Sequence, residues 1–185
     1  SKTVYFEKRG RENTEEVLRL TKQRADELGI KTVVIASTRG DTAVRAIDVL
    51  QGLRVIAVTL VSGFRTPDTQ QFTQENRQIV EGRGGVVLTT THAFGGISRA
   101  MRNTFNAYVT GDIIANTLRI FGEGMKVVVE IAMMAADGGL VRTNEEIIAI
   151  GGTGKGADTA VVLQPVNSHD FFDLKVKEIL CKPHF

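Results

Sequence analysis

The chain has 185 residues, of which 42% are hydrophobic and 24% charged, a balance that fits one globular domain and excludes intrinsic disorder and fibrous repeats. Its 23 Lys and Arg residues are mixed with 21 Asp and Glu residues, for a formal net charge of +2, which argues against binding to a nucleic-acid backbone. The single Cys181 excludes an internal disulfide, and neither a zinc motif nor an apolar stretch of membrane length occurs. We therefore expect one domain over residues 1–185, located in the cytoplasm, without metal, nucleic acid or membrane as partner.

Helices and strands are predicted to alternate in the first half of the chain. A helix is expected over residues 14–28, with Asn13 and Glu16 as a capping pair and Gly29 as its end. A strand is predicted next at residues 32–36, followed by a helix that ends at Leu50 and a strand at 54–60. A further helix at 68–81 and a strand at 85–90 complete this half. Such alternation indicates parallel pairing in an α/β fold.

The second half is predicted to add helices and a partly antiparallel edge. Helices are expected over residues 97–105 and 111–121. Residues 125–137 are ambiguous, because Val127 to Val129 favour a strand while the Ala/Met run before Gly138 favours a helix; we choose a buried helix. Strands are expected over 146–150 and 159–166, and residues 174–181 alternate like a terminal edge strand.

A loop rich in hydroxyl groups follows the first strand of the predicted main sheet. It reads Ser37-Thr38-Arg39-Gly40-Asp41-Thr42 and stands directly before a helix, whose first amide groups attract anions. Ligands of open α/β sheets bind beyond the carboxyl ends of the strands. An N-cap needs one hydroxyl, whereas this loop has three. We therefore favour phosphate binding over the alternative, an N-cap with a solvated arginine. The candidate phosphate-binding residues are Ser37, Thr38, Arg39, Gly40 and Thr42.

Gly40 has a particular role in this hypothesis, because glycine lets a phosphate approach the backbone closely. Its place in a loop predicts that Gly40→Val blocks the phosphate and leaves the fold largely intact. The phosphate ligand should then bind the variant weakly.

A second candidate loop, Gly151 to Asp158, contains four glycines and Lys155. It fits G-x-G-x-x-A only superficially, because a strand is predicted after it where the dinucleotide fingerprint needs a helix, and it lacks the ending of a P-loop. A flexible turn between two strands is an equal alternative to a ligand loop. The candidate ligand-binding residues here are Gly152, Thr153, Gly154, Lys155, Gly156, Ala157 and Asp158.

A third loop, Thr89 to Gly96, also follows a predicted strand and contains Thr91 and His92. Imidazole titrates near neutral pH, so His92 is a weak candidate for a general acid or base as well as for a ligand contact. A purely structural histidine is the favoured alternative. No catalytic triad, carboxylate pair or activated cysteine is indicated, so catalysis is left open.

These loops resemble those of a known family. Ala36 to Ala43 is similar to the Thr-x-Ser-Gly-x-Thr-Ala segment of the pyruvate kinase C-terminal domain, where it holds the phosphate of an effector. Nearly the whole chain resembles a small archaeal family of stand-alone proteins like that domain, through Phe6-Glu-Lys with Asn13-Thr14, Thr90-Thr-His92, and Glu130-Ile131 with Met134-Ala-Ala-Asp137-Gly-Gly-Leu140. The resemblance implies a three-layer α/β/α sandwich with strand order 3-2-1-4-5, and FMN as cofactor.

The sequence leaves three functions open. The first is a phosphate-anchored FMN-binding protein, with flavin-dependent oxidoreductase activity as one form of it. The second is a regulatory or binding module for a phosphorylated metabolite or nucleotide, without catalysis. The third is an oligomeric scaffold in which the Met-rich segment and the terminal strand lie between subunits. None includes pyruvate kinase catalysis, which needs a barrel that these residues do not encode.

Overall fold

Seven strands form one sheet in the computed structural model, which describes residues 2–185. In chain order they are β1 (Val4–Phe6), β2 (Thr32–Ala36), β3 (Arg54–Val58), β4 (Val86–Leu88), β5 (Ile147–Gly151), β6 (Thr159–Gln164) and β7 (Lys175–Pro183). Across the sheet the order is β1-β7-β6-β5-β2-β3-β4. The run β4-β3-β2-β5-β6 is the expected 3-2-1-4-5 order, so the predicted sheet topology is confirmed.

The sheet is parallel in its centre and antiparallel toward one edge. Strands β4, β3, β2 and β5 are parallel, while β6 is antiparallel to both β5 and β7. The last strand, β7, was expected at the edge, but β1 pairs with it in parallel and covers it. The first strand has only three residues, which is too short for a periodic pattern to be visible in the sequence.

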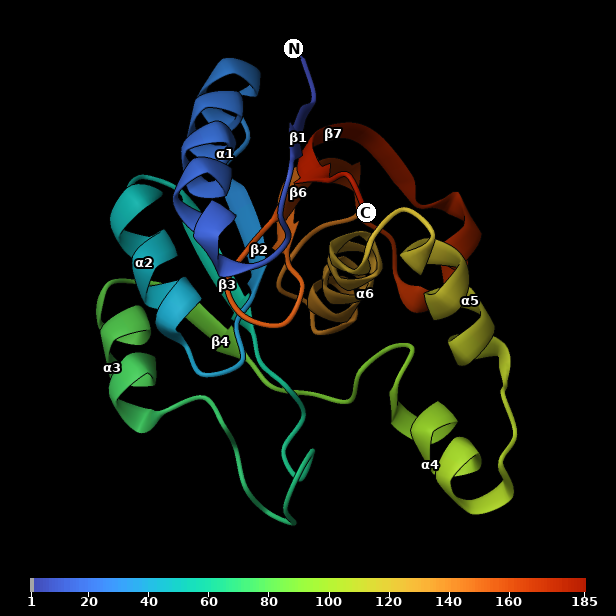
Figure 1. Ribbon diagram of the computed structural model, residues 1–185. Helices are drawn as coiled ribbons and strands as arrows, with labels where there is room; N and C mark the ends of the chain where they lie inside the picture. The colour runs from blue at the N-terminus through green and yellow to red at the C-terminus, as the bar shows by residue number, and fades with distance from the viewer. Residues whose placement is uncertain (1) are drawn as a thin grey trace.

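Helices cover both faces of the sheet. On one face lie α1 (Thr14–Leu28), α2 (Asp41–Val49) and α3 (Gln74–Gly82); on the other lies α6 (Glu123–Asp137), with α5 (Thr110–Arg119) packed against it. Helix α4 (Gly96–Phe105) lies at the periphery, away from the sheet (Figure 1). Two 3-10 turns, η1 (Arg11–Asn13) and η2 (Ser168–Asp173), complete the elements. Across residues 2–185, none of the helices combines the length and apolar content that crossing a bilayer requires.

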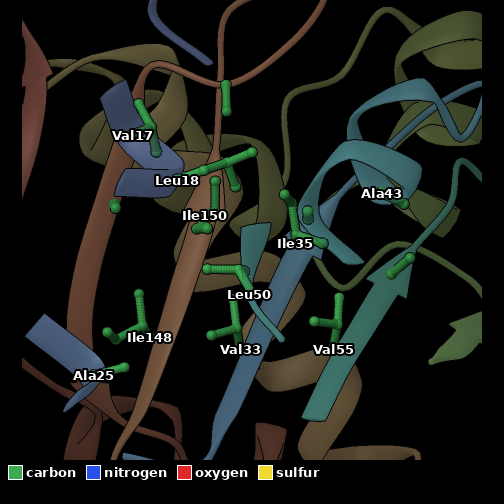
Figure 2. Close-up of a cluster of buried hydrophobic side chains, with 14 of the residues drawn as sticks. Val17, Leu18, Ala25, Val33, Ile35, Ala43, Leu50, Val55, Ile148 and Ile150 are labelled. Carbon is green, nitrogen blue, oxygen red and sulfur yellow. The ribbon is translucent and has the colours of Figure 1, made fainter. Parts of the chain in front are cut away.

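The central strands are buried on both faces, which explains their continuous apolar sequences. In β2, Val33 and Ile35 point toward the helices α1 and α2, whereas Val34 points toward α6. Figure 2 shows the buried cluster on the side of α1 and α2, to which Leu18, Val33, Ile35, Ile148 and Ile150 all belong. The alternation places one row of side chains in each of two cores.

Two local expectations are corrected by the structure. Helix α3 begins at Gln74 rather than residue 68, because Thr73 caps it by accepting a hydrogen bond from the amide of Asn76, and Asp68 has a positive φ of 61°. The side chain of Asn13 does not cap α1; its amide group donates to the carbonyls of Lys8 and Gly10. The remaining end of α1 agrees with the prediction, since Gly29 adopts a left-handed conformation.

The Met-rich segment does not lie between subunits in the way that the scaffold hypothesis expects. It forms α6, and Met133 and Met134 are buried in the core of the same chain. The choice of a helix over a strand for residues 125–137 is confirmed.

Candidate functional site

The two predicted ligand loops leave the sheet side by side. Strand β2 pairs in parallel with β5, so the segments that begin at Ser37 and Gly152 emerge at the same edge. This edge is the carboxyl end of the parallel strands, where open α/β sheets bind ligands. The placement agrees with the expectation that these loops flank the point where the strand order reverses.

The Ser37–Thr42 loop caps α2 and leaves two amides free for another acceptor. The hydroxyl oxygen of Ser37, which is 6% exposed, accepts from the amide of Ala43 at 3.3 Å, and the carbonyl of Gly40 accepts from Val44 at 2.9 Å. Within residues 2–185, the amides of Asp41 and Thr42 have no acceptor. One hydroxyl therefore serves as the cap, and the half-buried hydroxyls of Thr38 and Thr42 remain available.

Charged groups beside this loop have opposite effects on an anion. The side chain of Arg39 is exposed, and its backbone carbonyl accepts from Thr73 and from the side chain of Asn76. Asn76 also donates to the carboxylate of Asp41 at 3.1 Å. Asp41 interacts favourably with the helix dipole, but it would repel a phosphate bound at the same helix end.

Gly40 is needed for packing, so the expected effect of Gly40→Val is wrong. Its φ is +101°, and a Cβ atom would lie 2.6 Å from Cβ of Asn76 and 2.9 Å from the ring of Phe72. The residue is buried under these two side chains. Although Gly40 lies in a loop, its substitution would disturb the fold and cannot serve as a selective test of phosphate binding.

The Gly152–Asp158 loop is a hairpin connection that anchors the N-terminal segment. It joins the antiparallel strands β5 and β6, as the turn hypothesis predicts. The carboxylate of Asp158, 0% exposed, accepts from the amide of Gly10 at 2.9 Å and from the hydroxyl of Thr159 at 2.8 Å.

Other residues of the same loop also contact the N-terminal segment. The amide of Ala157 donates to the hydroxyl of Thr14 at 3.0 Å, and a Cβ at Gly156 would lie 2.4 Å from Cα of Arg11. Thus Gly156, Ala157 and Asp158 already have structural partners. The residues still open to a ligand are Gly152 and Thr153, both partly exposed, and Gly154 and Lys155 at the exposed tip.

His92 connects two loops at the edge of the sheet. Its Nε2 accepts from the amide of Val61 at 3.1 Å, and its ring lies 6.0 Å from that of Phe64. Burial lowers the pKa of His92, and the nearby carboxylate of Glu130 opposes this effect. A neutral ring that accepts a backbone hydrogen bond fits the structural alternative, and its catalytic role stays a prediction.

The lowered pKa of His92 predicts a loss of stability in mild acid. Unfolded chains take up a proton near the ordinary value of about 6.5, while the folded state resists it. The free energy of unfolding should therefore fall as pH drops from 7.5 to 5.5. Urea unfolding of the native chain and of His92→Gln checks this, because the substituted amide cannot titrate. An equal pH slope in both proteins would show that His92 is not responsible.

A buried ion pair that the sequence interpretation left without a role fixes the loop of His92. The carboxylate of Glu130 accepts from the amide of Phe94 at 2.8 Å and pairs with Lys126 at 2.8 Å. The two side chains are 6% and 14% exposed. Their spacing of four residues on α6 is a detectable signal in the sequence, but the contact with Phe94 is not local.

A cavity of about 620 Å³ lies beside this loop, between α5, α6 and η2. Its volume is in the range typical of small-molecule sites. The aromatic and methionine residues that line it are Phe94, Phe171, Phe172, Met133 and Met134. The polar residues that line it include Thr90, Thr91, His92, Thr110, Asp137 and Ser168. Two predicted residues, Thr91 and His92, are therefore brought together here. No residue of Ser37–Thr42 or Gly152–Asp158 is among those that line it.

Cys181 offers no nucleophile to either location. It is buried in the core on β7, between β1 and β6, and burial raises the pKa of its thiol to about 12. A thiolate is the reactive form of cysteine, so this residue is a core side chain.

The sheet order, its helical layers and the loops at its carboxyl edge define an α/β domain with a parallel centre. The chain belongs to the family described as the pyruvate kinase alpha/beta domain, whose model matches residues 15–163. Pyruvate kinase of Cryptosporidium parvum is similar over 83% of this chain, with 14% identity and a TM-score of 0.43. A structure of that kinase in complex with ADP covers 80% of this chain, with 15% identity and a TM-score of 0.38. The chain spans 22% of the length of either kinase structure.

Proposed function

We propose that this domain binds FMN and anchors its phosphate at the N-terminus of α2. The observation that carries the proposal is the pair of unpartnered amides of Asp41 and Thr42 at the carboxyl end of β2, with the hydroxyl of Thr38 nearby in the chain. Amides at a helix start, reinforced by the helix dipole, are a common phosphate site. Family membership supports the proposal, because the resemblance of this loop is to a phosphate-holding segment.

The fit of the residues to a phosphate is good at the backbone and weaker in charge. Two amides point out of the helix end, and Arg39 is the nearest cation in sequence. Asp41 reduces the attraction, so the site suits a ligand that is also held elsewhere. The cavity lined by Thr91, His92 and aromatic side chains has the volume and composition to hold a flat ring.

When bound, FMN would supply electron or hydride transfer. The protein's own groups there would bind and orient it: hydroxyls and amides at the phosphate, aromatic and methionine side chains at a ring. Because no substrate is identified, an oxidoreductase reaction stays part of the proposal. The relationship to an archaeal family and the cytoplasmic location, both expected from the sequence, are also part of the proposal.

One observation favours a second function, a regulatory module for a phosphorylated metabolite or nucleotide. The loop of Ser37 and the aromatic cavity share no residue, so a phosphate could bind at α2 without any ring in the cavity. Such a ligand would bind through the same amides and would leave the protein colourless. The described residues form no barrel of the pyruvate kinase type, and kinase catalysis is not proposed for them.

Neutralising Asp41 is expected to strengthen FMN binding selectively. Asp41→Asn keeps an oxygen that can accept from Asn76 and removes a charge beside the phosphate, so FMN affinity should rise roughly two- to fivefold at low salt. Riboflavin, which lacks the phosphate, should be unaffected. Flavin fluorescence titrations of both ligands measure this.

The matched control is Asp48→Asn, which neutralises a carboxylate near the other end of α2 that pairs with Arg83. It should change neither affinity. If Asp41→Asn and Asp48→Asn behave alike, the phosphate is not at the start of α2.

The visible spectrum of freshly purified protein separates the two functions, because flavin bands support the first and a colourless protein without FMN affinity supports the second.

A further inference from the structure

The cavity between α5, α6 and η2 contains a charge that the proposed function does not use. This charge is the carboxylate of Asp137, the last residue of α6. Among the residues of 2–185 that line the cavity, no lysine or arginine occurs, and His92 accepts a hydrogen bond through Nε2 as a neutral ring. The lining of the cavity therefore carries a net negative charge.

Ser168 of η2 holds this carboxylate in one orientation. The backbone amide of Ser168 donates to Oδ1 of Asp137 at 2.9 Å, and its hydroxyl donates to Oδ2. Burial raises the pKa of Asp137, but hydrogen bonds from Ser168 and Asn167 outweigh it, so the pKa lies below its ordinary value and the group stays ionised. A carboxylate has about four acceptor positions. These donors therefore leave at least one position for a ligand.

The chain itself provides no cation to match this charge. Within residues 2–185, no lysine or arginine pairs with the carboxylate of Asp137, and His169 has only a minor effect on its pKa. Helix α6 ends at Asp137, so the negative end of the helix dipole adds to the charge of the side chain. A cationic group is what would complement this end of the cavity.

Aromatic rings line the same cavity and favour such a cation. Phe171 makes edge-to-face contacts with Phe94 and Phe172, with ring centres 5.8 and 5.1 Å apart. Phe172 is 88% exposed, the highest value among the large hydrophobic side chains of residues 2–185. Aromatic faces attract ammonium groups, and a ligand that covers an exposed ring removes apolar surface from water. The lining thus combines an unpaired carboxylate with a ring that is open to a ligand.

We propose that this cavity binds a small aromatic amine, with its ammonium group on the carboxylate of Asp137 and its ring against the phenylalanines of η2. An anion is the alternative, because Thr110 and Gly111 at the start of α5 also line the cavity. A helix start carries only about half a unit of positive charge. The full charge of Asp137, reinforced by the end of α6, outweighs it.

The inference goes beyond the proposed function and does not depend on it. The loop at the start of α2, where the phosphate of FMN is proposed to bind, shares no residue with this cavity. A flavin ring in the cavity would leave the carboxylate of Asp137 without a cation. The experiments below use no flavin, so their failure and the failure of FMN binding are distinguishable.

Three ligands of similar size and different charge test the proposal on the native chain. They are phenethylamine, phenethyl alcohol and phenylacetate, titrated at neutral pH while amide chemical shifts are followed by NMR. Phenethylamine should bind about five- to tenfold more tightly than the alcohol, because a partly exposed ion pair and a cation–ring contact each contribute modestly. Phenylacetate should bind most weakly. The largest shifts are expected at Phe94, Ser168 and Phe171.

Three results would overturn the proposal. The first is equal affinity for the amine and the alcohol, and the second is tightest binding of phenylacetate, which would move the charge preference to the start of α5. The third is no binding of the amine up to about 10 mM, since a ligand of this size is expected to bind in the millimolar range.

Asp137→Asn tests the assigned residue. It keeps an oxygen that accepts from Ser168 but removes the charge, so the affinity for phenethylamine should fall to that for the alcohol, whose own affinity should not change. The matched control is Asp173→Asn, which neutralises an exposed carboxylate of η2 that does not line the cavity and should alter neither affinity. A folded Asp137→Asn that binds the amine as tightly as the native chain contradicts the proposal. If this variant does not fold, the ligand series on the native chain decides.

Discussion

Gly40→Ala should destabilise the domain by about 3 kcal/mol, since it combines a strained backbone with a steric clash. The new Cβ would lie 2.6 Å from Asn76 and 2.9 Å from Phe72, at a φ of +101°. Asn76 also holds the carbonyl of Arg39, so the shift that relieves the clash would disturb the start of α2. Urea unfolding measures the loss.

Gly52→Ala is the matched control, because Gly52 also has a positive φ of +86° but no atom within 4 Å of the added Cβ. It should cost about 1 kcal/mol, the backbone part alone. Equal losses in the two variants would contradict the packing account and return Gly40 to the simpler interpretation of a loop glycine.

Asp158→Ala should cost about 3 kcal/mol, because it leaves one buried and one partly buried hydrogen-bond donor without an acceptor. These are the amide of Gly10 and the hydroxyl of Thr159. For a chain of this size the loss corresponds to a fall in Tm of roughly 6–12 °C. Amide exchange should rise most in residues 4–14, which the carboxylate ties to the Gly-rich loop.

Two further variants separate this effect from general damage to the loop. Lys155→Ala changes an exposed side chain in the same loop and should stay within about 0.5 kcal/mol of the native protein. Asp158→Asn, which keeps one good acceptor, should fall between the two. If Asp158→Ala is as stable as Lys155→Ala, the N-terminal segment is not anchored through this carboxylate.

The central strands and main helices could be predicted from sequence because their signals are local. Strand β2 is a run of β-branched residues buried on both faces, and α6 is recognisable from its Ala/Met run and the glycines that follow Asp137. The start of α3 was misplaced because Thr73, the residue that caps it, stands inside a polar stretch. Strand β1 was missed, since three residues carry no period and its partner is β7 at the far end of the chain.

In the candidate site, too, the features with local sequence signals could be predicted and the contacts between distant segments could not. The placement of the Ser37 and Gly152 loops at one edge follows from strand order, which the sequence pattern and the resemblance could supply. Contacts that bring distant segments together were not predictable. Gly10 reaches Asp158 across 148 positions, and Val61 reaches His92 across 31. Gly40 illustrates the consequence, because its need for space depends on Phe72 and Asn76, which no local pattern links to it.

The central claim is that a phosphate anchors a flavin at the start of α2. The most direct measurement is a fluorescence titration of the unmodified chain with FMN and with riboflavin at low and high salt. The account predicts that FMN binds at least tenfold more tightly and that raising the salt weakens FMN far more than riboflavin. Equal affinities at both salt concentrations would contradict anchoring by phosphate, and the absence of binding by either flavin would contradict the flavin assignment itself.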